Sequence, residues 1–442
     1  MSESPARIAI LGASGLIGQA LTSHLMQEGH QVLPIARRFS AAQKASFGGS
    51  AIECPVVGLG SQRLASLLFE QGADIVVNCI GVLRDDNRGR PEIVHQEFVS
   101  NLVEALASRA VPCLLIHVSI PGLEKEDRTS FSLTKRRAES TITSGPVPFI
   151  ILRPGFVVAP AAFGGSALIR ALAMLPASLP AREAGAPFAP LEISDIARTV
   201  TVVAHRWRAG ERDWNVTWEL MDQSHANVDD VITAFRDHLG GPAARLRMPS
   251  WLLDAGAAMG DFAAHFGWSP PIGTMALGEM RRGVAGDPGP WIEATGIEPV
   301  PLHAMLQRTP ATIQEKWFAR LYLIKAVSIA VLVLFWVVSG LIALTVAFDA
   351  ATAILTSHGF PDRLAWAITV VSSLADIAVG LAIAFKKTCR AGLLAGIGVS
   401  LFYLGSAAML MPDMWIEPLG ALIKTLPAII LMLVILATLE NR

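Results

Sequence analysis

The residues best suited to chemistry near the start of the chain are three glycines, each separated from the next by two residues. They belong to the stretch Gly12-Ala13-Ser14-Gly15-Leu16-Ile17-Gly18, which follows a β-type run at 7–11 and opens an amphipathic helical stretch at 16–28. Glycine lets a ligand approach the backbone where a Cβ would block it, and a helix N-terminus attracts anions. This spacing predicts a turn that binds a dinucleotide pyrophosphate. We expect contacts from Gly12, Ser14, Gly15, Leu16, Ile17 and Gly18.

Two arginines, Arg37 and Arg38, follow the second β-type run at 31–36. An acidic residue at this place would bind the ribose 2′-hydroxyl of NAD(H), whereas guanidinium groups suit the 2′-phosphate of NADP(H). The sequence therefore favours NADP(H) over NAD(H). The alternative is that both arginines are simply solvated in a loop.

Further β-type runs and helical stretches alternate along the chain. The runs lie at 51–56, 75–79, 114–118 and 149–152, and the helical stretches at 62–71, 92–108 and 132–143. Such alternation predicts an α/β fold with a doubly wound parallel sheet of the Rossmann type, with its ligand at the carboxyl ends of the strands. We expect the cofactor-binding core over 1–155, a substrate lobe over 156–300, a linker over 301–318 and a membrane domain over 319–442.

Four motifs in order make the chain resemble the atypical and extended branches of the short-chain dehydrogenase/reductase superfamily. Besides the glycine turn, they are Asn78-Cys79-Ile80-Gly81, His117-Val118-Ser119 and Leu152-Arg153-Pro154-Gly155. Within that superfamily the chain is most similar to the group containing the nucleotide-binding accessory subunit of respiratory complex I. The resemblance implies cofactor contacts from Cys79, Ile80, Gly81 and Pro154.

The resemblance also implies a catalytic Tyr-x-x-x-Lys pair with an upstream serine, in which the phenol moves the substrate proton and the lysine holds the ribose. The matching residues are Phe131, Lys135 and Ser119, so the tyrosine is missing. Ser119 and Lys135 are the catalytic candidates that remain. Lys135 either acts directly as the acid or contacts the cofactor ribose. His95 and His117 are either alternative proton donors or ordinary structural histidines.

Composition restricts the class of protein. Of the 442 residues, 52% are hydrophobic and 17% charged, and the mean hydropathy of +0.47 indicates a chain partly embedded in lipid. A formal net charge of −1 gives no basic face for nucleic acid, so nucleic-acid binding is not expected. Four cysteines without CxxC spacing predict free thiols and no metal site.

Four apolar runs near the C-terminus are each about as long as the ~20 residues that cross a bilayer. They lie at 326–345, 364–385, 391–411 and 419–439. Basic loops alternate with acidic ones, which predicts a bacterial-type inner-membrane protein with its N-terminal domain and C-terminus in the cytoplasm. The tail resembles the DoxX-like membrane family, notably in Trp415-Ile416-Glu417-Pro418-Leu419-Gly420.

Asp376 lies near the middle of the second apolar run, where a carboxylate is expensive unless it is paired or functional. Axial offsets along the helices make Lys424 a slightly better partner than Lys325. The carboxyl group then either fixes helix packing or has a proton or ligand role. Gly392 and Gly396 form a GxxxG step, which predicts close helix approach.

The predicted substrate lobe has apolar helical stretches at 166–174 and 251–266, which favour a lipophilic ligand. Its aromatic residues either pack in the core or dock on the bilayer surface, where such rings prefer the interface. These aromatic residues are Trp251, Phe262, Phe266 and Trp268. Ser194-Asp195 is interpreted as the N-cap of a helix.

Two functions of different classes fit the sequence. The first is a membrane-tethered NADP(H)-dependent oxidoreductase for a lipophilic substrate such as a quinone or isoprenoid. The second is a non-catalytic NADP(H)-binding sensor, assembly factor or accessory subunit of a membrane redox complex. Phe131 and the similarity to the complex I subunit favour the second, whereas tethering beside a substrate that partitions into the bilayer favours the first.

Overall fold

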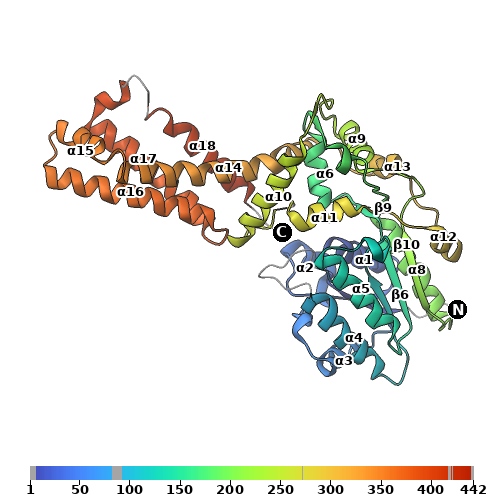
Figure 1. The fold of residues 1–442 in the computed structure, drawn as a ribbon. Helices are drawn as coiled ribbons and strands as arrows, with labels where there is room; N and C mark the ends of the chain where they lie inside the picture. The colour runs from blue at the N-terminus through green and yellow to red at the C-terminus, as the bar shows by residue number, and fades with distance from the viewer. Residues whose placement is uncertain (1–5, 82–91, 271, 417–419, 421, 440–442) are drawn as a thin grey trace. The chain divides into compact units, whose positions relative to one another are not determined.

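The computed structural model describes residues 6–81, 92–270, 272–416, 420 and 422–439. The chain divides into two compact units (Figure 1). One comprises residues 1–260 and 271–319, and the other comprises residues 261–270 and 320–442. The first contains the parallel sheet, and the second contains the long apolar helices.

The first unit contains a seven-stranded sheet in the order β10-β6-β5-β4-β1-β2-β3, with every neighbouring pair parallel. Its strands are β1 (Arg7–Leu11), β2 (Gln31–Ala36), β3 (Ile52–Glu53), β4 (Ile75–Asn78), β5 (Leu114–Val118), β6 (Phe149–Pro154) and β10 (Asn215–Leu220). The order reverses between β1 and β4, and sheets of this kind bind ligands at that switch point. The predicted doubly wound parallel sheet is confirmed.

Helices cover both faces of the sheet because strand side chains alternate between two buried clusters. They are α1 (Leu16–Gln27), α3 (Ser61–Phe69), α4 (Phe98–Ala107), α5 (Ser130–Thr143) and α8 (Ile193–Arg208). Ile8 and Ile10 pack with α1 and α8 on one face, and Ala9 and Leu11 pack with α3, α4 and α5 on the other. In each βα unit the helix starts at the carboxyl edge of the sheet, so this edge gathers the predicted site residues.

A lobe of short elements follows β6. They are β7 (Phe156–Val158), α6 (Gly165–Ala173), β8 (Ala177–Ser178), α7 (Ala181–Ala184), β9 (Pro190–Glu192), α9 (Val228–Leu239), β11 (Leu246–Arg247), α10 (Ser250–His265), α11 (Thr274–Arg282), α12 (Gly289–Thr295) and α13 (Leu302–Gln307). The predicted N-cap at Ser194-Asp195 is wrong, because α8 begins at Ile193 and Glu192 is its N-cap. Asp195 is instead buried in the first turn, where its carboxylate accepts from Arg198 at 2.5 Å and from the Val300 amide at 3.3 Å.

The apolar helices of the C-terminal region are α14 (Ile313–Leu344), α15 (Phe348–Ser357), α16 (Asp362–Ala384), α17 (Cys389–Leu410) and α18 (Thr425–Thr438). Of the helices in the described ranges, α14, α16 and α17 are long and apolar enough to cross a membrane. The fourth predicted run, at 419–439, forms the 14-residue α18. Residues 417–419 and 421 of that region lie outside the described residues.

Asp376 has a different partner from either predicted lysine. Its Oδ1 accepts a hydrogen bond from the Tyr403 hydroxyl of α17 at 2.9 Å, whereas Lys325 donates to the Thr438 carbonyl oxygen. Axial offset alone missed Tyr403 because it says nothing about which side of each helix faces its neighbour. The close approach predicted from Gly392 and Gly396 is confirmed: a Cβ there would lie 2.7 Å from Ile383 N and 2.8 Å from Met432 Sδ, respectively.

Candidate cofactor site and active site

The glycine turn lies between β1 and α1 at the switch point of the sheet. Gly12 has φ +83°, a conformation that favours glycine, and its N–H donates to the Ile35 carbonyl oxygen at 2.9 Å. A Cβ on Gly12 would lie 3.1 Å from Ile80 Cγ1, and one on Gly18 would lie 2.4 Å from the Gly12 oxygen. The turn can therefore keep this shape only with glycine at both places.

The start of α1 offers backbone donors that no side chain caps. Gly15 is the N-cap residue, with extended backbone, and it has no side chain to accept from the first-turn amides. The first turn of a helix always leaves such N–H groups without intrahelical acceptors. The amides of Leu16, Ile17 and Gly18 lie there and suit a pyrophosphate. The residues present therefore fit the predicted dinucleotide.

Arg37 and Arg38 follow β2 at the same edge of the sheet as the glycine turn. The register pairs Leu11 of β1 with Ile35 of β2, which places the arginines beside the end of β1. Both side chains are exposed. The next helix, α2 (Ala41–Phe47), is linked to the turn, because Gln43 Nε2 donates to the Ser14 carbonyl oxygen at 3.1 Å. The two arginines thus lie at the same edge of the sheet as the start of α1.

Lys135 lies buried on α5 at the carboxyl edge of β4 and β5. Its Nζ donates to the Val118 carbonyl oxygen at 2.9 Å, and a Cβ on Gly81 would lie 3.4 Å from Nζ. Burial lowers the pKa of Lys135 to about 8 and raises the pKa of the nearby Cys79 thiol to about 12. The lysine therefore titrates near neutral pH, which a proton donor requires, whereas the thiol stays protonated.

The lowered pKa of Lys135 gives a testable pH dependence. The unfolded chain binds this proton up to its ordinary pKa of 10.5, whereas the folded chain loses it near 8. Below pH 8 the folded state carries the full cost of burying a charged ammonium group. As the pH rises from 8 to 10.5 the folded state loses this proton while the unfolded state keeps it. We therefore expect the unfolding free energy of wild type to rise by about 3 kcal/mol over this range relative to that of Lys135→Met. Thermal unfolding of both proteins across this range measures the difference. A difference that does not change with pH would contradict the shift.

Phe131 lies one turn before Lys135, in the place of the missing phenol. Its ring packs edge-on against His95, with centroids 5.5 Å apart. The Thr134 hydroxyl lies 2.9 Å from His95 Nδ1 and donates to the Ser130 carbonyl oxygen at 2.7 Å. The tautomer of His95 decides which of these two groups is the donor. Burial lowers the pKa of His95 to about 3, so this imidazole is neutral at neutral pH.

His117 is joined to the last residue of the neighbouring strand. Asn78 Oδ1 accepts from the Ile80 amide at 3.0 Å, which directs Asn78 Nδ2 to His117 Nδ1 at 3.1 Å. Burial lowers the pKa of His117 well below its usual value. Two neutral, buried histidines fit the structural interpretation better than proton donation. The contact of Asn78 with His117 was not predicted from the sequence. The available signal was that both residues are polar and lie near the ends of apolar strands that pair with each other.

Ser119 is buried directly after β5, and its N–H donates to the Leu152 carbonyl oxygen at 2.7 Å. It lies beside Glu139, one helical turn beyond Lys135 on α5. Burial would raise the pKa of Glu139, but hydrogen bonds from Arg153 and the charges of Arg136 and Arg153 hold it below its usual value. The Ser119 hydroxyl is buried and has no hydrogen-bond partner among the described residues.

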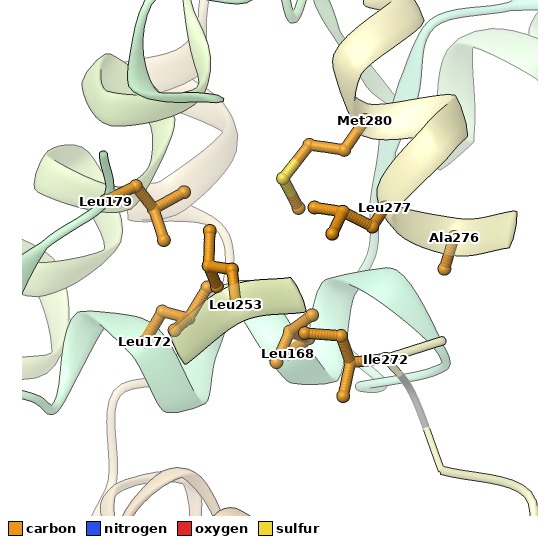
Figure 2. A pocket seen from close by; sticks show the side chains of 8 residues that line it. All are labelled: Leu168, Leu172, Leu179, Leu253, Ile272, Ala276, Leu277 and Met280. Carbon is orange, nitrogen blue, oxygen red and sulfur yellow. The ribbon is translucent and has the colours of Figure 1, made fainter. Parts of the chain in front are cut away.

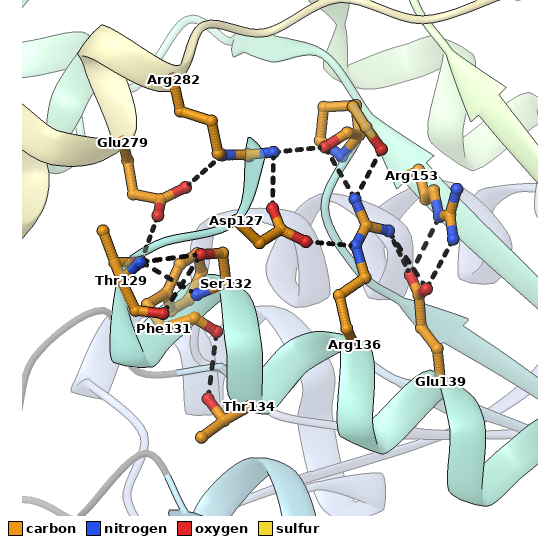
Figure 3. A network of polar contacts seen from close by, with 12 residues as sticks. Asp127, Thr129, Phe131, Ser132, Thr134, Arg136, Glu139, Arg153, Glu279 and Arg282 are labelled. Atoms are coloured by element: carbon orange, nitrogen blue, oxygen red, sulfur yellow. Dashed lines mark hydrogen bonds and ion pairs between the residues drawn. The ribbon is translucent and has the colours of Figure 1, made fainter. Parts of the chain in front are cut away.

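A polar network that the sequence analysis missed ties α5 to the lobe helix α11 (Figure 3). Asp127 accepts from Arg136 Nε at 2.8 Å and from Arg282 Nη1 at 3.2 Å, and the Thr129 hydroxyl donates to Glu279. Two ion pairs of the network have i,i+3 spacing, Arg136 with Glu139 and Arg282 with Glu279. That spacing was the only local signal of the network in the sequence. Buried ion pairs of this kind fix geometry more than they add stability. The network therefore sets the position of α5 against the lobe.

A small apolar cavity lies inside the lobe between α6, α10 and α11 (Figure 2). Its volume is about 30 Å³, and its lining is entirely aliphatic or methionine. The lining residues are Leu168, Leu172, Leu179, Leu253, Ile272, Ala276, Leu277 and Met280. A space of this size holds about one small group, so a larger lipophilic ligand would require these side chains to move.

Two family models match different parts of the chain. Residues 8–166 match the NAD dependent epimerase/dehydratase family, and residues 333–433 match the DoxX-like family. The first match covers β1 to β6 with the glycine turn and Lys135. The second covers most of the apolar helices.

Curated relatives match short parts of the chain. The dTDP-6-deoxy-L-talose 4-dehydrogenase (NAD(P)(+)) of Kitasatospora kifunensis is 33% identical over 118 residues, which cover 26% of this chain and 35% of that protein. An uncharacterised protein of Mycobacterium tuberculosis is 33% identical over 101 residues, which cover 23% of this chain and 10% of that protein. The chain thus spans about a third or less of these relatives.

Solved structures share the fold of the first unit. The enzyme WbmG of Bordetella bronchiseptica, solved with NAD, has a TM-score of 0.53 at 16% identity over 73% of this chain and 97% of its own. A human epimerase family protein, solved with NADPH, has a TM-score of 0.51 at 20% identity over 68% of this chain and 98% of its own. The chain thus has an N-terminal Rossmann-type domain that matches the NAD dependent epimerase/dehydratase family over residues 8–166, and a C-terminal region that matches the DoxX-like family over residues 333–433.

Proposed function

We propose that the chain is a membrane-tethered, NADP(H)-dependent oxidoreductase that acts on a lipophilic carbonyl compound, such as a quinone or an isoprenoid aldehyde. The observation that carries this proposal is Lys135, a buried amine with its pKa lowered to about 8 at the edge of the sheet that also carries the glycine turn. The DoxX-like domain supports a lipophilic substrate, because tethering raises the frequency of encounters with compounds that partition into the bilayer.

In this proposal the residues divide into binding and proton-moving groups. The first turn of α1 would hold the pyrophosphate, and Cys79, Ile80, Gly81 and Pro154 would supply further contacts to the nucleotide. A bound NADPH supplies the hydride. Lys135 Nζ donates a proton to the substrate oxygen while the Val118 carbonyl oxygen holds the amine in place. Ser119 remains the candidate for a hydrogen bond to the same oxygen.

The preference for NADP(H) is tested by titration of NADPH and NADH against the full-length protein in nanodiscs. Losing charge-assisted hydrogen bonds to a phosphate costs about 1.5–3 kcal/mol. We therefore expect Arg37→Ala with Arg38→Ala to weaken NADPH binding roughly 10- to 100-fold, with little effect on NADH. Arg137→Ala, an exposed arginine on the outer side of α5, is the matched control. Equal losses for both nucleotides would refute a 2′-phosphate contact.

Phe131 favours a second function, a non-catalytic NADP(H)-binding accessory subunit or sensor of a membrane redox complex. Its ring packs against the neutral His95 and has no proton to transfer. The two functions are separated by turnover: NADPH oxidation with decylubiquinone or farnesal supports the enzyme. Stoichiometric binding without oxidation, together with recovery of a stoichiometric membrane partner in mild detergent, supports the accessory role.

A further inference from the structure

Helix α10 is apolar on two opposite sides. On one side Leu253, Ala257 and Gly260 are buried, at the i, i+4, i+7 spacing of a single face. A Cβ on Gly260 would lie 2.1 Å from the Ile272 carbonyl oxygen, so this side packs closely against the chain that follows. The core therefore already occupies one side of the helix.

The opposite side of α10 is an exposed apolar face formed by Trp251, Leu252, Met259 and Phe262. Their exposed fractions are 68%, 44%, 64% and 66%. Of the two acids on the helix, Asp254 is directed to Arg281 at 2.8 Å and Asp261 directly precedes Phe262. Large apolar side chains gathered on one face are unusual on the surface of a soluble domain and indicate a partner that removes them from water. We call these four residues the outer face of α10.

The last residues of α10, from Asp261, and the segment that follows the helix belong to the membrane unit. Within that unit, Trp268 Nε1 donates to the Ala384 carbonyl oxygen at 2.7 Å, and the Lys386 amide donates to the Phe266 carbonyl oxygen at 3.0 Å. Phe266 also packs edge-on against Phe385, with centroids 5.1 Å apart. These partners belong to the turn between α16 and α17, which must lie at a membrane surface because it joins two spanning helices.

The length of α10 then limits how far the outer face can be from the bilayer. The helix has 16 residues, and at ~1.5 Å per residue it is about 24 Å long. Every residue of the outer face is therefore within roughly one helix length of the membrane surface, whatever direction the helix takes. The membrane surface is therefore the partner that the turn between α16 and α17 places near the outer face of α10.

The residues before α10 have the composition of a membrane-surface segment. Arg245 and Arg247 are exposed on either side of Leu246, whose side chain is 67% exposed. Arginines beside an apolar face attract anionic headgroups, and tryptophan prefers the boundary between headgroups and acyl chains.

We propose that α10 lies along the membrane surface, with its outer face in the interface and with Arg245 and Arg247 against anionic lipid headgroups. The proposal rests on the membrane domain and not on the proposed catalytic function. It gives the lobe a second attachment to the bilayer, besides the helices that cross it. That attachment would hold the apolar cavity of the lobe close to the source of a lipophilic substrate.

The test places a nitroxide spin label at Met259→Cys in the full-length protein, with its four free cysteines replaced by serine, in nanodiscs of phosphatidylcholine with phosphatidylglycerol. Power saturation compares access of oxygen, which concentrates in lipid, with access of a water-soluble nickel chelate. The matched control is Val111→Cys, a 61% exposed valine between α4 and β5. We expect a positive depth parameter at 259 and a negative one at 111. Equal nickel access at both positions would overturn the proposal.

Two further outcomes keep the experiment decisive. A label at 259 that is shielded from both oxygen and nickel would mean that protein covers the outer face, which also overturns the proposal. In the variant Trp251→Glu with Leu252→Glu, the depth parameter at 259 should fall toward the value at 111, with unchanged thermal unfolding because both side chains are exposed. Removing phosphatidylglycerol should lower the depth parameter at 259 less than the double substitution does, because the apolar contacts with lipid remain.

Discussion

Replacing Gly18 by alanine is expected to weaken NADPH binding by roughly 100-fold or more and to lower the free energy of unfolding by about 1–3 kcal/mol. The added Cβ would lie 2.4 Å from the Gly12 oxygen and 2.8 Å from Ala13 Cα, so the turn must open to admit it. An opened turn no longer directs the first amides of α1 at one pyrophosphate. Intrinsic fluorescence titration measures the affinity, and thermal unfolding without nucleotide measures the stability.

Gly15→Ala separates the two effects of this change. A Cβ at Gly15 would meet only the Gly12 oxygen, at 3.3 Å, so we expect the fold to be nearly unaffected while the methyl group still obstructs the ligand. Gly256→Ala, which has open space around its Cβ, is the control for both measurements. If Gly15→Ala and Gly18→Ala bind NADPH as tightly as wild type, the turn does not bind the nucleotide.

Phe131→Tyr is expected to raise turnover by roughly 100-fold, because it returns a phenol to the helix position one turn before Lys135. Lys135→Met is expected to lower turnover by roughly 100- to 10,000-fold, because the amine that donates to the Val118 carbonyl oxygen is then lost. Rates of NADPH oxidation with decylubiquinone or farnesal measure both. In wild type the pH dependence of the rate should show a group with a pKa near 8 that must be protonated.

Lys125→Met controls for the loss of a lysine, since Lys125 is exposed in the loop before α5. If Lys135→Met keeps its rate while NADPH affinity falls, Lys135 contacts the cofactor ribose and another group moves the proton. No turnover in wild type, in Phe131→Tyr or in any other variant, together with tight NADPH binding, would leave the accessory role as the function of the chain.

Local patterns predicted six of the seven strands of the sheet, because most of these strands are apolar runs between turn residues, but they missed β10, in which polar and apolar residues alternate. The runs at 31–36 and 114–118 coincide with β2 and β5. The third run was predicted at 51–56, but β3 ends at Glu53 because Val56–Gly58 forms a 3-10 turn after Pro55. Alternation with helices then fixed the topology, because parallel strands need crossover connections.

Contacts between distant parts of the chain could not be predicted from spacing. Asp127 and Arg282 are far apart in sequence, and only the folded lobe brings them to 3.2 Å. The same limit explains the partner of Asp376, since the rotation of α16 and α17 about their axes decides that Tyr403 faces it. The short helix α15 lies between the first two predicted runs, and its ten residues are too few for a spanning pattern.

The most direct test of the account is a cryo-EM map of the full-length chain in nanodiscs with NADPH. The account predicts nucleotide density with its pyrophosphate at the start of α1, its 2′-phosphate beside Arg37 and Arg38, and its nicotinamide ring near Lys135 Nζ. A map with the glycine turn filled by side chains, or with NADPH bound elsewhere, would contradict it.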